Sequence, residues 1–292
     1  MFGVGLSLTL ADFISIIRHP RAFFTALSAQ MLGLPVIAFV ISLIAPIPAA
    51  LKVGFIILAA SPGGATSGFL TYLWRGNVAL SLSLTAVNSF LTLFSIPVVV
   101  NLGLRVFIGR ETDLHLPFWE TVSQIFFITI IPASVGVFVR QHFPVFANKI
   151  NKPAKYVMLL LLGMVFAIKM FAGESYGGAG LKWGDLAVIT PVALVQNAAC
   201  LFFGYYFMKY MLLPRSSRIT AAMESGVQNT TLAFLIANNL LGNQAMVKPA
   251  LVYSLYSFWT ACFFAYQANK RNGIRSTPVV MDEEEREHAR DD

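Results

Sequence analysis

Charged residues are scarce in this sequence of 292 residues. Only 12% are Asp, Glu, Lys or Arg, about half of the roughly 25% that is typical of soluble domains. Hydrophobic residues make up 57%. This composition excludes a soluble globular enzyme. At about 20 apolar residues per membrane-spanning helix, a chain of this length can cross a bilayer about eight to ten times, so we interpret it as a polytopic membrane protein.

Cysteine and histidine are also rare, which limits the chemistry of a site in the membrane. Cys200 and Cys262 lie in apolar runs, and their spacing indicates neither a metal site nor a disulfide framework. None of the four histidines lies in the middle of an apolar run. Because a second buried carboxylate and a phosphate-binding glycine loop are missing too, we expect no enzyme activity and no catalytic residues.

The basic residues form a topology signal. Lys and Arg total 21 against 14 Asp and Glu, and seven of these acids lie in the last eleven residues. Nearly all basic residues stand between apolar runs or at their ends, which indicates membrane topology and not nucleic-acid binding. When the Lys and Arg residues in successive connections between spans are assigned to alternate sides of the membrane, thirteen lie on the side of the C-terminus and five lie on the other side. The C-terminus is therefore expected in the cytoplasm.

Continuous apolar runs predict eight full spans and a stub. The predicted spans are residues 22–46, 53–74, 77–104, 118–139, 154–172, 187–213, 217–241 and 246–268. The stub, residues 1–11, would rise only about 16 Å as a helix, against a hydrocarbon core of about 30 Å. It is either a half-span continued by residues 12–21 or the end of a helix whose first part is missing, and we favour the second interpretation.

Two spans contain helix breakers at mid-membrane depth. Residues 61–68 combine Pro62, Gly63 and Gly64 with three hydroxyl side chains. Residues 224–231 carry a carboxylate, two amides and three hydroxyls around Gly226. Non-helical backbone is tolerated in a membrane only where protein or a cavity supplies its hydrogen-bond partners. The sequence therefore predicts two discontinuous helices.

Glu224 is the polar residue with the highest expected cost of burial. An ionisable group near the bilayer centre costs at least about 2.5 to 3.5 kcal/mol and is usually paired or functional. The cations within the predicted span limits, such as Lys169 and Lys209, lie about one helical turn from a span end and can reach the interface. We therefore expect a bound cation or a proton as the partner of Glu224. The alternative is a protonated Glu224 that hydrogen-bonds to Gln228 or Asn229 as a structural contact.

Further polar residues in the spans line up with these two breaks. They are Gln30, Ser81, Thr85, Asn88, Ser89, Gln196 and Asn197. Singly, each could be a contact between helices. Together they predict two three-helix units, residues 22–104 and 187–268, each with a broken middle helix. The units have opposite orientations, as in the inverted repeats of secondary transporters.

Three motifs resemble those of the bile acid:sodium symporter family. They are MFGVGLSL from Met1, PGG with the later TYL and GNVALS from Pro62, and E-x-G-x-Q-N from Glu224. The resemblance covers about residues 1–268 and implies an all-α fold of ten helices, of which the first would be missing here. The implied panel domain contains residues 1–21 and 118–172. The implied core contains 22–104 and 187–268 with two crossed helices, and residues 269–292 form a charged tail that we expect to be disordered.

The resemblance also implies two Na⁺ sites. The first consists of Ser67, Ser81, Thr85 and Glu224. The second consists of Gln30, Glu224, Gln228 and the backbone at Ser225 and Val227. Gly68 departs from the family pattern, which often has Asn at this position. The first site is therefore lost, completed by backbone or water, or replaced by proton coupling.

The expected function is sodium-coupled import of an organic anion, either a bile-acid-like steroid or a small carboxylate, by alternating access. Na⁺ is the coupling ion and no other cofactor is expected. The anion is placed near Thr66, Asn229 and Thr230, because helix N-termini favour carboxylates. The expected location is a bacterial inner membrane, with the lipid bilayer as the other partner. A proton-coupled or uncoupled carrier of the same fold is the alternative, and a channel fits less well.

Overall fold

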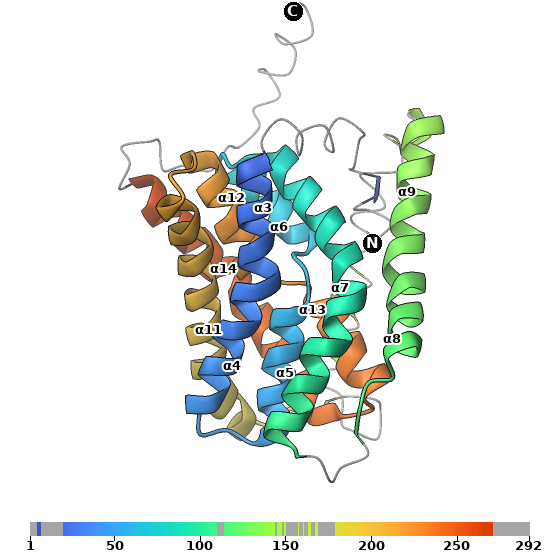
Figure 1. Cartoon of the computed structure of the whole chain (residues 1–292), viewed down its shortest axis with the longest axis vertical. Helices are drawn as coiled ribbons and strands as arrows, with labels where there is room; N and C mark the ends of the chain where they lie inside the picture. Colours follow the sequence, from blue (N-terminus) through green and yellow to red (C-terminus); the bar gives the residue numbers. More distant parts are fainter. Residues whose placement is uncertain are drawn as a thin grey trace, which may run out of the picture.

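The computed structural model describes residues 20–109, 114–143 and 179–270, with residues 5–6, 145–147 and seven positions between 149 and 168. Within these ranges all the secondary-structure elements are helices, and the axes of the long helices are roughly aligned in one bundle (Figure 1). The elements are α3 (Pro20–Ser28), η1 (Ala29–Gly33), α4 (Leu34–Ile44), α5 (Ala49–Ala60), α6 (Ala65–Leu73), α7 (Val78–Phe107), α8 (Phe118–Ile125), η2 (Phe126–Ile130), α9 (Ile131–His142), α11 (Trp183–Tyr210), α12 (Arg215–Gly226), α13 (Thr230–Leu235), η4 (Ile236–Leu240) and α14 (Gln244–Lys270).

Four helices in the described ranges are long and apolar enough to cross a membrane. They are Pro20–Ile44, Val78–Phe107, Phe118–His142 and Trp183–Tyr210. Each matches a predicted span to within a few residues, which confirms the expected membrane protein. α14 corresponds to the predicted span 246–268, whereas most residues of the predicted span 154–172 lie outside the described residues. Large apolar side chains such as Phe24, Leu43 and Trp259 are exposed on the outside of the bundle, where lipid would cover them.

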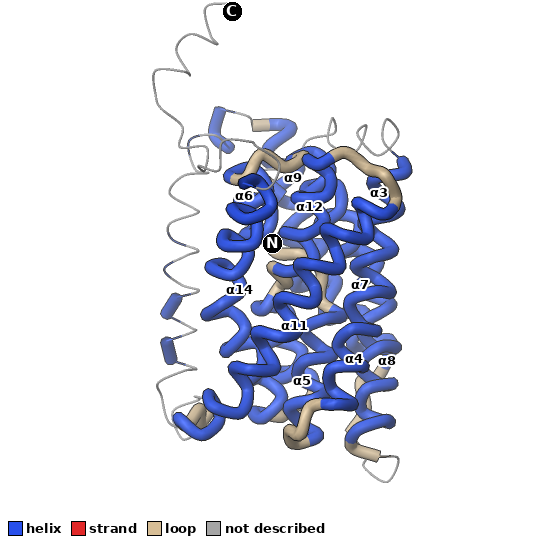
Figure 2. The backbone as a smooth tube through the Cα atoms, turned by 90° about the vertical axis from the view of Figure 1, so that its left-hand side faces the viewer, coloured by secondary structure: helices blue, strands red, loops and turns tan. Residues whose placement is uncertain are grey.

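Both predicted interruptions are present. The first lies between the end of α5 at Ala60 and the start of α6 at Ala65, and the second between α12 and α13. Figure 2 shows this non-helical backbone inside the bundle. The Gly64 amide donates to the Val227 carbonyl at 3.3 Å, and the Asn229 amide donates to the Pro62 carbonyl at 2.8 Å. The two breaks therefore satisfy each other's backbone groups, as a membrane interior requires.

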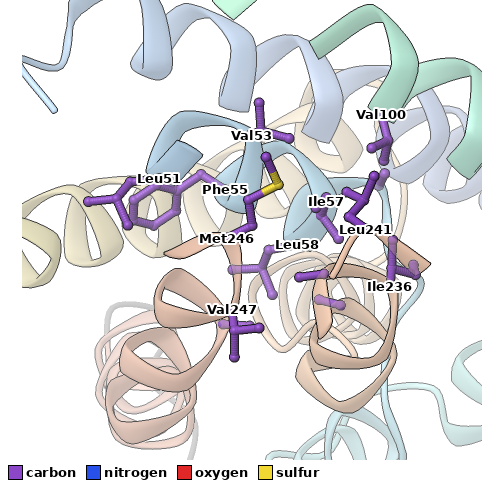
Figure 3. Packing of buried hydrophobic residues seen from close by; sticks show 14 of the residues in the cluster. Leu51, Val53, Phe55, Ile57, Leu58, Val100, Ile236, Leu241, Met246 and Val247 are labelled. Atoms are coloured by element: carbon purple, nitrogen blue, oxygen red, sulfur yellow. The ribbon is translucent and has the colours of Figure 1, made fainter. Parts of the chain in front are cut away.

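The hydrophobic core surrounds α5. Its residues Val53 to Ala60 are all buried, and α5 packs against α4, α7 and α14. Figure 3 shows Phe55 and Leu58 beside Met246 and Val247 of α14. A helix that is apolar and buried on every side has no lipid-facing surface. This packing holds the first half of the first interrupted helix in the centre of the bundle.

The segment α8–η2–α9 lies along one flank of the bundle (Figure 1). It contacts α7, and the Asn101 side chain pairs with both the amide and the carbonyl of Leu116 at 2.8 and 2.9 Å. Gly5 lies so close to α9 that a Cβ atom there would be 2.0 Å from the Ala133 carbonyl oxygen. Gly5 and α9 therefore lie together, and both belong to the part of the chain that the resemblance assigns to the panel domain.

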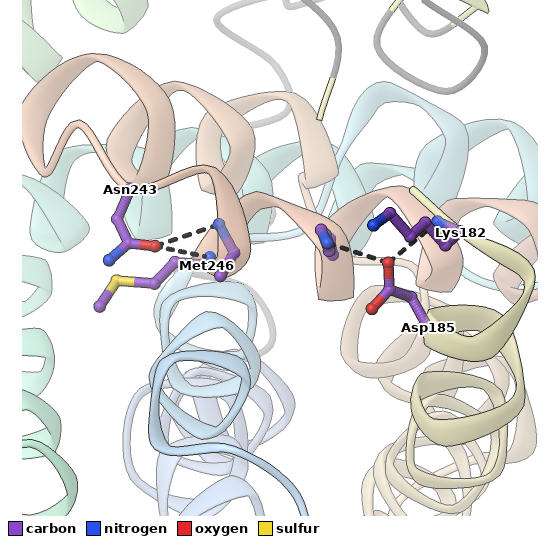
Figure 4. A network of polar contacts seen from close by, with 6 residues as sticks. Lys182, Asp185, Asn243 and Met246 are labelled. Atoms are coloured by element: carbon purple, nitrogen blue, oxygen red, sulfur yellow. Dashed lines mark hydrogen bonds and ion pairs between the residues drawn. The ribbon is translucent and has the colours of Figure 1, made fainter. Parts of the chain in front are cut away.

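One end of the bundle carries an ion pair between α11 and α14 (Figure 4). Asp185 accepts from the Lys182 amide and from the Lys248 ammonium group, each at 2.9 Å. Asn243 accepts from the amides of Ala245 and Met246 and so caps the start of α14. Of these contacts, the ion pair joins the two helices that flank the second interrupted helix.

Candidate functional site

A fully buried carboxylate lies where the interrupted helices meet. Glu224 is in the last turn of α12 and has no exposed surface. Its Oε1 accepts from the hydroxyls of Ser67 at 2.7 Å and Ser81 at 2.5 Å, and its Oε2 accepts from the hydroxyl of Thr85 at 3.1 Å. The four residues predicted for the first Na⁺ site thus lie in one cluster, although α6, α7 and α12 supply them.

The first break makes room for this carboxylate. A Cβ atom added to Gly63 would be 2.1 Å from Glu224 Oε2, far inside van der Waals contact. At Gly64 the nearest atom, Asn229 Cα, would be 3.7 Å away, which is an ordinary contact. Of these two neighbouring glycines, Gly63 is therefore needed for the close approach of Glu224. The non-helical backbone at Gly63 also forms the antiparallel bridge to Gln228.

The residues predicted for the second site have polar atoms without partners. Gln30 lies in η1, near the Glu224 carboxylate, and its Oε1 accepts from Asn88 Nδ2 at 2.5 Å. The Nε2 atom of Gln30 is buried and forms no hydrogen bond of normal length and angle to any residue that the structure describes. The same holds for Gln228 Oε1 and Ser225 Oγ, which belong to residues less than 5% exposed. Because an unsatisfied buried polar atom costs about 1 to 3 kcal/mol, these oxygens are suited to an additional ligand.

The residues predicted for substrate binding lie at two adjacent helix N-termini. Asn229 caps α13 by accepting from the Leu232 amide at 3.1 Å, and Thr230 is half-buried. Thr66 is exposed in the first turn of α6, whose N-terminus has no side-chain cap. An anion could therefore bind at α6 without displacing a capping group. Gly68, the departure from the family pattern, leaves open space, since a Cβ there would meet only Ser81 Oγ at 3.6 Å.

Three polar residues hold the second break from outside. Asn197 of α11 and Tyr253 of α14 both donate to the Gly226 carbonyl at 2.8 Å, and Thr260 donates to Asn197. Asn197 stood out in the sequence as a polar residue in a span. Tyr253 and Thr260 did not, because single hydroxyls in an apolar run are common and their partners are distant in sequence.

The polar groups around Glu224 offer oxygen atoms, which are hard ligands for metal cations. They are side-chain hydroxyls, side-chain amides and one carboxylate. In the part of the chain that the structure describes, no Lys or Arg forms an ion pair with Glu224, and no group of three or more His, Cys, Asp or Glu could hold a metal. An alkali cation is the ion that this donor set fits, because it prefers oxygen and needs few formal charges.

Comparison with known proteins gives a consistent result. The family model described as Sodium Bile acid symporter family matches residues 1–178. The chain is similar to the probable sodium/metabolite cotransporter BASS2, chloroplastic, of Oryza sativa subsp. japonica, with 29% identity over 252 residues, or 86% of this chain and 58% of the relative. It therefore spans less than two thirds of the length of that relative.

Two further relatives match most of this chain. The uncharacterized sodium-dependent transporter YocS of Bacillus subtilis is 29% identical over 265 residues, covering 88% of this chain and 76% of the relative. The ileal sodium/bile acid cotransporter of Oryctolagus cuniculus is 24% identical over 270 residues, covering 90% of this chain and 75% of the relative. The names of all three relatives refer to sodium.

Proposed function

Because the chain belongs to the sodium/bile acid symporter family, we propose that it is a sodium-coupled secondary transporter that imports an organic anion. The observation that carries this proposal is the Glu224 carboxylate, fully buried where the two interrupted helices meet. An isolated buried charge is unfavourable by several kcal/mol. A Na⁺ ion that enters with the substrate would neutralise it, and the ion's release would allow the carrier to return.

Two groups of ligands are proposed for Na⁺. The first consists of Ser67, Ser81, Thr85 and Glu224. The second consists of Gln30, Glu224, Ser225, Val227 and Gln228. The unpaired oxygens of Gln228 and Ser225 support the second group, because they have capacity for a ligand. In the first group Gly68 contributes no side-chain oxygen, so the second group is the main coupling site.

Transport is proposed to proceed by alternating access between two parts of the chain. Residues 22–104 and 187–268 form the core, which is an inverted repeat whose crossed helices carry the ions. Residues 1–21 and 118–172 form the panel, against which the core moves. This division is supported by the position of α8–η2–α9 on one flank and by the opposite directions of α7 and α14 (Figure 1).

The proposed substrate is an organic anion, either a bile-acid-like steroid or a small carboxylate. The uncapped N-terminus of α6 at Thr66 and the neighbouring Asn229 and Thr230 would bind its negative charge.

The proposed location is a bacterial inner membrane with the C-terminus in the cytoplasm. Figure 1 supports this orientation, because the starts of α3 and α12 and the end of α14, all near basic residues, lie at one end of the bundle.

Ion-dependent stability of the purified protein tests the proposal. Its unfolding temperature is measured in NaCl, KCl and choline chloride at the same ionic strength and pH. A rise specific to Na⁺ is expected, because an ion that binds only the folded state stabilises it. Counterflow of labelled organic anions in liposomes, with and without Na⁺, then identifies the substrate. Equal stability in the three salts, with anion uptake unaffected by Na⁺, would contradict sodium coupling and favour a carrier in which Glu224 takes up a proton.

A further inference from the structure

The carbonyl oxygen of Gly226 has two donors from outside its own helix. Asn197 Nδ2 of α11 and the Tyr253 hydroxyl of α14 each donate to it at 2.8 Å. Both side chains are 1% exposed. A carbonyl at a helix end has no intrahelical partner, and here both of its lone pairs are used by side chains from two different helices. The end of α12 is therefore attached to the two long helices that flank it.

A third side chain supports the orientation of the Asn197 amide. If the amide were rotated by 180°, its oxygen would face the Gly226 oxygen and the two would repel each other, so the Gly226 carbonyl selects the orientation in which Nδ2 points to it. Asn197 Oδ1 then lies 2.5 Å from Thr260 Oγ1, and because an amide oxygen carries no hydrogen, the hydroxyl donates to it. The same hydroxyl also lies 2.9 Å from the Tyr256 carbonyl and 3.1 Å from the Ser257 carbonyl, so Thr260 connects the Asn197 amide to the backbone of α14.

The anchored Gly226 carbonyl lies between two pairs of backbone carbonyls that differ in their hydrogen bonds. The Val227 carbonyl accepts from Gly64 and the Gln228 carbonyl accepts from Thr230. For the carbonyls of Glu224 and Ser225, by contrast, no hydrogen bond to another described residue is found. Rotation of the peptide after Gly226 would move both groups of oxygens. The two hydrogen bonds to Gly226 restrict this rotation.

Close packing further restricts rotation of the peptide after Gly226. A Cβ atom at Gly226 would be 2.3 Å from the Leu201 side chain, so α11 touches the backbone at this point. One turn further along α11, a Cβ at Gly204 would be 2.8 Å from Ser225 Oγ. The contact surface and the Asn197 hydrogen bond are thus on the same helix, and both act on the residues that follow Glu224.

From this arrangement we propose that Asn197, Tyr253 and Thr260 are positioning residues that hold the Gly226 carbonyl and thereby set the affinity of the Na⁺ site formed by residues 224–228. The inference rests on the proposed function, since it assigns the three residues to that site. None of them binds the ion. Their effect is on the geometry of the oxygens that do.

The test uses Tyr253→Phe, which removes one donor and keeps the ring, with Tyr256→Phe of the same helix as the matched control. The Na⁺ concentration for half-maximal thermal stabilisation is measured for the full chain in detergent. Tyr253→Phe is expected to raise it about three- to tenfold, the range for the loss of one hydrogen bond, and Tyr256→Phe to leave it unchanged. The unfolding temperature without Na⁺ is measured in parallel, to separate stability from affinity.

A second pair of variants keeps the proposal falsifiable if Tyr253→Phe does not fold. Thr260→Val removes the hydroxyl at similar volume and is expected to weaken Na⁺ binding, whereas Thr260→Ser retains the hydroxyl and is expected to restore it. If the variants have a lower unfolding temperature but the same half-maximal Na⁺ concentration as the wild type, the positioning role is refuted and the proposed function stands. If the wild type itself shows no response to Na⁺, the proposed function fails, and this inference fails with it.

Discussion

The two interrupted helices differ in how their breaks are held. Between α5 and α6, the break contains Pro62, Gly63 and Gly64, and the partners of its backbone come from the second break and from its own helix ends. Between α12 and α13, the break is also attached to α11 and α14 through Asn197 and Tyr253. The first break thus depends on the second, whereas the second is fixed to its flanking helices.

The difference corresponds to what each break contributes. The first contributes space, because the missing side chain of Gly63 admits the Glu224 carboxylate. The second contributes the charge itself and the unpaired oxygens next to it. A charge in a low-dielectric interior is sensitive to small displacements, so the element that carries it benefits most from a rigid attachment. The element that only makes room can be built from small residues.

The largest effect is expected when the charge of the second break is removed. Glu224→Gln keeps the shape and most hydrogen-bonding atoms, but it removes the negative charge that would attract Na⁺. The Na⁺-specific stabilisation, about 2.7 kcal/mol at an ion concentration one hundred times the dissociation constant, is expected to disappear. Thermal unfolding in NaCl and KCl measures this. Glu120→Gln, at an exposed position of α8, is the matched control and is expected to behave like the wild type.

A smaller effect is expected when the space in the first break is filled. In Gly63→Ala the new Cβ would be 2.1 Å from Glu224 Oε2, and overpacking of this kind costs about 1 to 3 kcal/mol. In Gly64→Ala the nearest atom is 3.7 Å away, so a change within about 0.5 kcal/mol is expected. Unfolding temperature and Na⁺ affinity are compared for both variants. Equal loss in the two would contradict the assigned role of Gly63.

An added ligand in the first break would make the two breaks more alike. Gly68→Asn places an amide oxygen beside Ser81, in space that is open at the Cβ position. We expect Na⁺ affinity to rise by up to about tenfold, as for one added contact to a charged group, and the Na⁺ dependence to become steeper. Gly68→Ala has the Cβ without the amide and serves as the control. If both variants behave identically, the first group of ligands does not bind an ion.

The smallest effect is expected at the far ends of the helices that anchor the second break. The Lys248 and Asp185 side chains are 15% and 28% exposed, so the ion pair is partly buried at the end of the bundle. Solvent still reaches both groups, and we expect the pair to contribute about 1 kcal/mol, the upper end of the range for ion pairs in contact with solvent. Lys248→Gln is expected to lower the unfolding temperature slightly and to leave the Na⁺ affinity unchanged. A double-mutant cycle with Asp185→Asn isolates the pair. A large loss of Na⁺ affinity would show that the attachment of the second break extends along the whole of α11 and α14.

Much of the fold could be predicted because it follows from local composition. A run of about 20 apolar residues predicts a span wherever it occurs, and the matches at Pro20–Ile44 and Val78–Phe107 depend on nothing else. The interruptions were also predictable, since proline and clustered glycine disturb a helix through their own geometry. The predicted positions of helix ends differ from the observed ones by a few residues. Capping contacts set the observed ends, as where Asn77 accepts a hydrogen bond from the Leu80 amide.

The candidate site was predictable only in part. Glu224 stood out, since a carboxylate in an apolar run is costly whatever surrounds it. Ser67, Ser81 and Thr85 were visible as hydroxyl residues within the spans, but their assignment to an ion site came from the family resemblance. The contribution of Tyr253 could not be predicted, because its hydrogen bond to Gly226 joins residues 27 positions apart on different helices.

The sequence by itself determined a membrane-spanning helical chain with two broken helices and one buried carboxylate. Apolar runs, helix breakers and a carboxylate within an apolar run are all properties of short segments. Only the tertiary structure decided that the breaks meet, that Gly63 leaves room for Glu224, and that Asn197 and Tyr253 hold the Gly226 carbonyl. Such contacts depend on distances of a few ångströms between segments that are far apart in the chain. No local pattern of residues specifies those distances.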